Sequence, residues 1–177
     1  MFDFDQIKDT VKEFKRRQAR FIEMTASELM SLSDPELFEA ALARTEEKVC
    51  KFERFKDGVN ALSHPERVFY AASLYEMEVN NGGLCQYFVN ASRETAPFLA
   101  DSLGEIDAED HRKLFASFIS ENDIDVNDLS SFLIEDADDF PAQNERYPFD
   151  DFDNAFFALQ PIQDHLAPYV RLHIAAF

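Results

Sequence analysis

Residues 63–90 read SHPERVFYAASLYEMEVNNGGLCQYFVN and carry the clearest helix signals in the chain. Ser63 and Glu66 form a capping-box pattern, which marks the start of a helix. Apolar residues then recur at helical spacing on one side: Val68, Phe69, Ala72 and Tyr75. Asn-Gly-Gly ends the pattern, because glycine accepts the left-handed backbone found at helix termini. We expect a helix over residues 65–80, a tight corner at 81–83 and a short helix over 84–88.

Similar signals extend in both directions from this segment. Two further capping boxes pair Thr25 with Glu28 and Ser33 with Glu36. The first segment is amphipathic, with apolar residues spaced by three, four or seven: Phe4, Ile7, Val11, Phe14 and Phe21. Later helices are expected near residues 97–103, after Asp107, after Asp125 and over 152–177, whereas residues 136–149 are expected to form a loop.

The composition supports a single helical domain. The chain has 177 residues, of which 46% are apolar, and 19 of these are Phe, so a large core is expected. Only four glycines and no tryptophan occur, and no alternation typical of strands is present. We predict an all-α fold, a single compact domain 1–177 of eight to ten helices. Residues 1–60 form N-terminal helices of mixed charge, and residues 65–172 form an acidic core.

The net charge restricts the partners of the protein. Asp and Glu number 35 against 17 Lys and Arg, which gives a formal charge of -18. Phosphate binding needs basic side chains, so direct binding to nucleic acid or to an anionic membrane is not expected. Residues 1–70 hold 14 acids and 12 bases, whereas residues 71–177 hold 21 acids and 5 bases. The second part of the chain therefore carries nearly all of the imbalance.

The acids of the second part occur in short clusters. They are Asp101, Glu105, Asp107, Glu109, Asp110, then Glu121, Asp123, Asp125, Asp128, then Glu135, Asp136, Asp138, Asp139, and finally Asp150, Asp151 and Asp153. Three interpretations compete: a solvated surface with surplus helix caps, a cation site, or a surface that presents carboxylates as DNA presents phosphates. Self-repulsion among these acids costs stability, which suggests that the arrangement has a use.

Motifs for catalysis and metal binding are weak. Asp123-x-Asp125-x-Asn127 begins like an EF-hand loop, but Asp128 stands where the loop needs glycine. The four histidines are far apart, and no HExxH, P-loop, GxSxG or GxGxxG occurs. The two cysteines form no disulfide framework. We predict no catalytic residue, no metal ligand and no cofactor, and therefore a protein that is not an enzyme, although acid–base catalysis by a carboxylate pair stays open.

The corner and its flanks also carry a family resemblance. The pattern Glu-x-x-Asn-Gly-Gly followed by Gln-x-Phe-x-Asn is an unusual string, formed here by Glu78, Asn80, Asn81, Gly82, Gly83, Gln86, Phe88 and Asn90. It resembles the signature of the DNA-mimic protein family, small acidic all-α bacterial proteins that contain a domain of unknown function. The resemblance covers roughly residues 65–172.

This resemblance implies an acidic surface that imitates duplex DNA, and a homodimer. It also implies that this surface occupies the DNA-binding face of a transcriptional regulator or another DNA-binding protein, such as a nucleoid protein. The 16 clustered acids are the residues expected to do so here. The alternative is a helical interaction or scaffold module that uses the Asn-Gly-Gly corner, with the acids serving solvation; a cation-binding protein or an enzyme is the third hypothesis. The first residues lack the pattern of a secretion signal, and we expect a cytoplasmic protein.

Overall fold

The computed structural model describes the backbone of residues 4–177 and the side chains from Thr10 onward. Within these residues it contains helices and no strand, so the predicted all-α fold is confirmed. The α-helices are α1 (Phe4–Glu23), α2 (Ala26–Met30), α3 (Asp34–Val49), α4 (Phe55–Ala61), α5 (His64–Val89), α6 (Ala96–Glu105), α7 (Glu109–Glu121), α8 (Phe140–Asn144), α9 (Phe149–Phe157) and α10 (Gln163–Leu172). The short 3-10 helices are η1 (Ala91–Thr95), η2 (Ser130–Phe132), η3 (Ala137–Asp139) and η4 (Ile174–Ala176).

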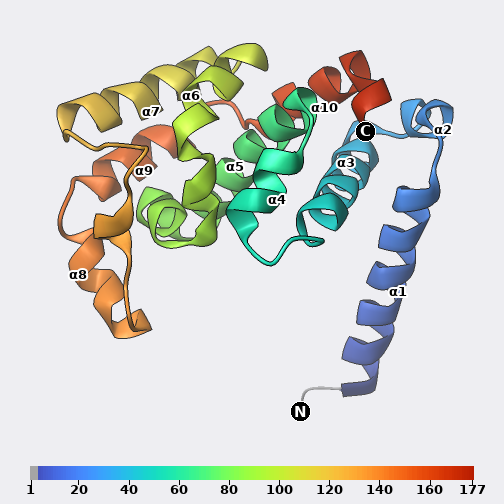
Figure 1. Cartoon of the computed structure of the whole chain (residues 1–177), viewed down its shortest axis with the longest axis horizontal. Coiled ribbons are helices and arrows are strands. Elements are labelled where there is room, and N and C mark those ends of the chain that lie inside the picture. Colours follow the sequence, from blue (N-terminus) through green and yellow to red (C-terminus); the bar gives the residue numbers. More distant parts are fainter. Residues whose placement is uncertain (1–3) are drawn as a thin grey trace.

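Helix α5 is the centre of the fold. It packs against α3, α6, α9, α10 and η1, and Figure 1 shows it surrounded by these elements. Its buried residues occur on most of its sides, which is typical of a helix enclosed by others. The Ser63 capping box begins this helix as predicted, since the Glu66 carboxylate accepts hydrogen bonds from both the backbone N–H and the hydroxyl of Ser63.

Aromatic side chains fill the core beneath α5. Tyr75 makes edge contacts with Tyr87, Phe115 and Phe156, at ring-centroid distances of 5.5–5.7 Å. Phe88 continues the cluster toward the C-terminal helices. Such pairs add to the free energy gained by burying each ring. Ten of the described phenylalanines are buried in this way, so the large core expected from the composition is present, although Phe14, Phe52 and Phe157 are exposed.

The two ends of the molecule differ in charge. In Figure 1, α1 lies at one end of the long axis, and the C-terminal part of α7, α8 and the start of α9 lie at the other. Helix α1 carries six basic and four acidic residues. Residues 121–151, which we call the acidic end, carry eleven acidic residues and one basic residue, Arg146.

The C-terminal part of helix α1 packs against α3. Phe21 is buried, and Arg17 pairs with Glu39 of α3 at 2.7 Å. Val11 and Phe14, on the same apolar stripe as Phe21, are 47% and 60% exposed.

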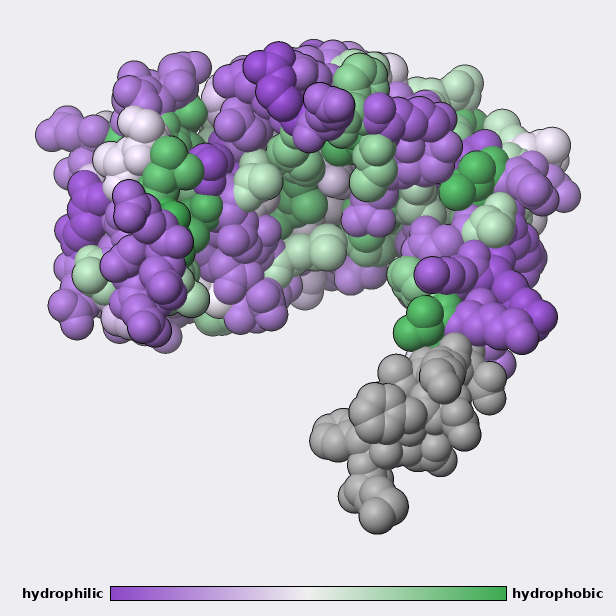
Figure 2. All heavy atoms as spheres, turned by 60° about the horizontal axis from the view of Figure 1, so that its bottom comes forward, coloured by the Kyte–Doolittle hydropathy of each residue, from purple (hydrophilic) through white to green (hydrophobic). Residues whose placement is uncertain are grey.

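Figure 2 shows that hydrophilic residues cover most of the face turned toward the viewer, with hydrophobic residues in smaller patches. None of the described helices is long and apolar enough to cross a membrane.

Three local predictions differ from the structure. Residues 136–149 contain η3 and α8 rather than only a loop, because Asp136 accepts a hydrogen bond from the Asp138 N–H and begins η3. Asp107 does not cap α7: its φ of 60° is left-handed, and Ala108 occupies the cap position. Asp125 instead accepts a hydrogen bond from Asn127 N–H in a turn, and only η2 follows.

Candidate functional site

The two glycines of the corner bend α5 sharply. Gly82 has φ of -162° and ψ of 26°, and Gly83 has φ of 80° and ψ of 176°. The second conformation is open almost only to glycine. The predicted corner at residues 81–83 is therefore confirmed, and so is the short helix expected immediately after it.

Asp153 of α9 lies directly behind this corner. Its Oδ1 accepts a hydrogen bond from the backbone N–H of Leu84 at 2.9 Å, and a Cβ at Gly83 would overlap its carboxylate. Burial raises the pKa of Asp153, against the lowering effect of the Leu84 hydrogen bond. Asp153 thus holds α9 against α5, while most of the other clustered acids face solvent.

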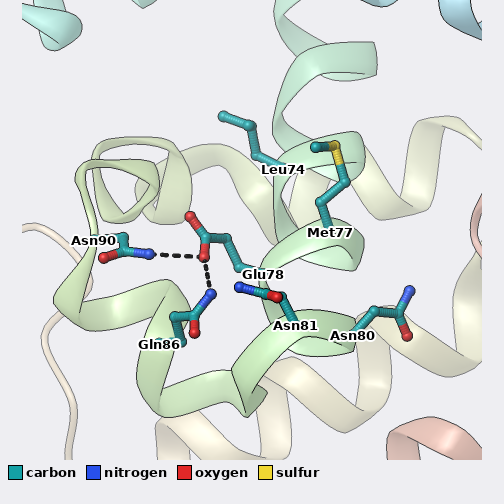
Figure 3. A pocket seen from close by; sticks show the side chains of 7 residues that line it. All are labelled: Leu74, Met77, Glu78, Asn80, Asn81, Gln86 and Asn90. Atoms are coloured by element: carbon teal, nitrogen blue, oxygen red, sulfur yellow. Dashed lines mark hydrogen bonds between the residues drawn. The ribbon is translucent and has the colours of Figure 1, made fainter. Parts of the chain in front are cut away.

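Glu78 is the hub of the polar signature residues. Its Oε2 accepts hydrogen bonds from Gln86 Nε2 at 2.7 Å and from Asn90 Nδ2 at 2.8 Å, and its Oε1 accepts one from Ser92 Oγ at 2.9 Å (Figure 3). The residues before and after the corner are therefore joined by side chains as well as by the chain itself. All three donors are neutral, so this network fixes the carboxylate in place without supplying a counter-charge.

A hollow of about 690 Å³ lies over this network. It is lined by Leu74, Met77, Glu78, Asn80, Asn81, Gln86 and Asn90. Figure 3 shows Asn81 extending toward Glu78 and Gln86, whereas Asn80 points away from them. Five signature residues therefore meet at one concavity, which we call the corner pocket. Phe88, in contrast, is fully buried in the aromatic core and shapes the fold rather than the pocket.

A second carboxylate of α5, Glu76, is buried and was not predicted as a site residue. It is only 8% exposed, and its Oε1 accepts a hydrogen bond from the backbone N–H of Ile162 at 2.6 Å, immediately before α10. Burial raises the pKa of Glu76. The sequence does hold a signal, because Glu76 falls at helical spacing between Ala72 and Val79 on the apolar side of α5. Its observed role is to cap α10 and hold it against α5.

The predicted surface acids are mostly exposed. Fourteen of the sixteen are exposed, whereas Glu109 and Asp153 are partly buried. Glu109 pairs with Arg112 at 2.6 Å, and this hydrogen bond lowers the pKa of Glu109. Glu105 contacts His64 at 2.9 Å. These acids have local partners, so part of the acidic surplus serves helix caps and ion pairs.

Within the acidic end, the acids divide into two groups. Four of them accept hydrogen bonds from nearby backbone N–H groups: Asp125, Asp128, Asp136 and Asp139. Seven exposed acids accept no hydrogen bond and form no ion pair with another residue of the described chain: Glu121, Asp123, Glu135, Asp138, Glu145, Asp150 and Asp151. These seven present free carboxylates to solvent.

The side chain of Arg146, the basic residue of the acidic end, is held by contacts within the protein. Its Nη1 donates hydrogen bonds to Ser131 O and Gln143 Oε1, and its guanidinium lies over the rings of Phe132 and Tyr147. It therefore pairs with no carboxylate of the described residues. Among the side chains from Thr10 on, no three His, Cys, Asp or Glu residues converge as a metal site would require.

The comparison with known families agrees with this arrangement. The family model described as DMP19-like protein matches residues 60–173. The chain belongs to the DMP19-like family. The matched region contains the corner pocket, the core helix α5 and the whole acidic end. The resemblance over residues 65–172 is thus confirmed at the level of the family. No curated protein and no solved structure gives a significant match.

Proposed function

We propose that the protein is a non-enzymatic DNA mimic whose acidic end occupies the DNA-binding face of another protein. The observation that carries the proposal is the set of seven free carboxylates at the acidic end, where the basic residue Arg146 is held in packing. A partner surface that binds DNA presents Lys and Arg, which such carboxylates attract. A transcriptional regulator or a nucleoid protein has this kind of surface.

The charge distribution along the molecule supports the proposal. The acids of the N-terminal part alternate with bases, and several form ion pairs, such as Glu47 with Lys51 and Asp57 with Arg54. The acidic end has no such compensation, so its negative potential extends into solvent. Membership of the DMP19-like family is compatible with this role. The homodimer that the resemblance implied stays a prediction.

The deciding experiment is competition with duplex DNA for a captured partner. The protein is immobilised, bound to DNA-binding proteins from a native lysate at low salt, and eluted with a salt gradient or with duplex DNA. We expect release by DNA and a steep loss of binding with salt, because exposed charges are screened beyond about 10 Å at 0.1 M salt. If the captured proteins stay bound in excess duplex DNA, the proposal is wrong.

A matched pair of double variants locates the binding surface. Glu121→Lys with Glu135→Lys reverses two free carboxylates of the acidic end. Glu23→Lys with Glu53→Lys makes the same change in net charge on exposed residues of the N-terminal part. Only the first pair should weaken partner binding markedly. Equal weakening by both pairs would mean that total charge, rather than the acidic end, drives the association.

The second candidate function is an interaction module that recognises its partner through the corner pocket. The observation in its favour is that five signature residues line one concavity. Reversing the charge of the acidic end would leave this mode of binding intact, so the same variants distinguish the two functions.

A further inference from the structure

We infer that the corner pocket binds the side chain of an arginine or lysine of a partner protein. The charge of the pocket favours a cation. Glu78 is the one formally charged residue among the seven that line the pocket. Its three hydrogen-bond donors are an amide, a second amide and a hydroxyl, so its negative charge is oriented but not neutralised. A cation is the ligand that such a carboxylate attracts, and an anion is repelled.

The Glu78 carboxylate can still accept a hydrogen bond from a guest. An ionised carboxylate has about four acceptor positions. Gln86 and Asn90 use Oε2, and Ser92 uses Oε1, which leaves Oε1 with one further acceptor position. One N–H of an ammonium or guanidinium group fills such a position, and charge-assisted hydrogen bonds of this kind are stronger than neutral ones.

One wall of the pocket is apolar. Leu74 and Met77 lie on the N-terminal side of the corner, above Glu78 (Figure 3), and Met77 is 44% exposed. Lys and Arg carry their charge at the end of an aliphatic stem, which packs along apolar surface. Methionine is flexible and adapts to such a guest. The Glu78 carboxylate therefore matches the charged end of a Lys or Arg side chain, and the apolar wall matches its aliphatic stem.

The pocket rim adds an acceptor and argues against a metal ion. The side chain of Asn81, which extends toward Glu78 (Figure 3), forms no hydrogen bond with other residues of the described chain, so its carbonyl oxygen is free to accept an N–H group. Metal sites in proteins usually combine several charged or imidazole ligands, whereas Glu78 is the one carboxylate that lines this pocket. An organic cation with several N–H donors suits a single carboxylate beside an amide carbonyl better.

This inference goes beyond the proposed DNA mimicry, because the pocket lies at the corner and not among the free carboxylates of the acidic end. It relies on the proposed function only for the expectation that the partner is rich in Lys and Arg. Asp153 links the two regions: it touches the corner, and the free acids Asp150 and Asp151 lie one turn or less before it on α9.

The test is an NMR titration of the whole protein with Nα-acetyl-arginine methylamide, and with the citrulline analogue as the neutral control of nearly equal shape. We expect the arginine probe, and not the citrulline probe, to shift the side-chain resonances of Asn80, Asn81 and Met77. Glu78→Gln should weaken this binding by about tenfold, because one charge-assisted hydrogen bond is lost. Asp138→Asn, at the acidic end, should leave it unchanged.

Because Glu78→Gln also alters the contacts of Gln86 and Asn90, Met77→Ser provides a second variant. This substitution removes exposed apolar wall and should weaken binding of the arginine probe while the helical circular dichroism stays unchanged. Shifts confined to the acidic end, or equal shifts with both probes, would overturn the inference. If duplex DNA displaces the captured partner but the arginine probe does not bind the pocket, only this inference is wrong. If the probe binds the pocket but DNA does not displace the partner, only the DNA-mimic proposal is wrong.

Discussion

The Asp153 carboxylate accepts a hydrogen bond from the backbone N–H of Leu84, 69 residues away in the sequence. The carboxylate fits there because Gly83 has no Cβ. The corner is therefore a joint between α5 and α9 as well as a bend. A change at either residue is expected to affect the corner pocket and the start of the acidic end together.

Gly83→Ala should destabilise the protein by at least about 2 kcal/mol. A φ of 80° with ψ of 176° strains any residue with a Cβ, and that Cβ would displace Asp153 from its hydrogen bond. Urea unfolding measures the loss. Gly104→Ala is the control, since Gly104 is helical and its Cβ would meet only the flexible Arg112 side chain, at 3.2 Å. The control should be neutral or stabilising by up to about 1 kcal/mol, and an equal loss in both variants would contradict the argument.

Asp153→Asn should stabilise the protein more at neutral pH than in acid. Burial raises the pKa of Asp153 in the folded state, so the folded protein holds this proton more tightly than the unfolded chain. The stabilisation that comes from the protonated carboxyl group is then lost as the pH rises above 3.8, the ordinary pKa of Asp. Asn keeps the acceptor for Leu84 without the charge. The difference in melting temperature between variant and wild type should grow from pH 4 to pH 7, and a difference that shrinks would show that the ionised carboxylate is the favoured form.

The capping boxes were predictable because each joins residues three apart. Thr25 with Glu28 and Ser33 with Glu36 form as the pattern indicates. Asp107 fits the same local rule, but its left-handed backbone places it in the turn before α7 instead. Local sequence does not resolve this competition between a cap and a turn.

The corner pocket was predictable in part. The glycines predicted the bend and the unusual string around them marked the segment, whereas the network that joins Glu78, Gln86 and Asn90 is seen only in the structure. The partnership of Asp153 with Leu84 depends on where α9 docks, which no local pattern encodes. The same holds for Glu76, whose partner is 86 residues away.

Glu76→Ala should cost about 1–3 kcal/mol, because it leaves the buried N–H of Ile162 without an acceptor. Glu76→Gln keeps an acceptor of the same length and removes the cost of burying a charge. It should therefore be close to wild type in thermal unfolding at pH 7. If the two variants are equally destabilised, the charge of Glu76 at the start of α10, and not the hydrogen bond, is what stabilises the fold.

The two cysteines should react with Ellman's reagent at very different rates. Cys50 is exposed, whereas Cys85 is fully buried, and burial raises its pKa to about 11. The thiolate is the reactive form, so Cys85 is protected by its protonation as well as by its packing. At pH 8 one thiol per chain should react within minutes, and the second only in denaturant. Cys50→Ser should abolish the fast phase, and a fast phase that survives this substitution would place Cys85 in an open site.

Glu121→Lys should raise the stability of the protein while it weakens partner binding. Glu121 is the last residue of α7, where the helix dipole disfavours an acid and favours a base, and it has no ion pair in the described chain. The substitution also relieves repulsion at the acidic end, so a gain of about 0.5–1 kcal/mol is expected from urea unfolding. Surface acids kept only for solvation would allow this gain at no functional cost. A variant that is more stable and still binds its partner with full affinity and wild-type salt dependence would remove Glu121 from the DNA-mimicking surface.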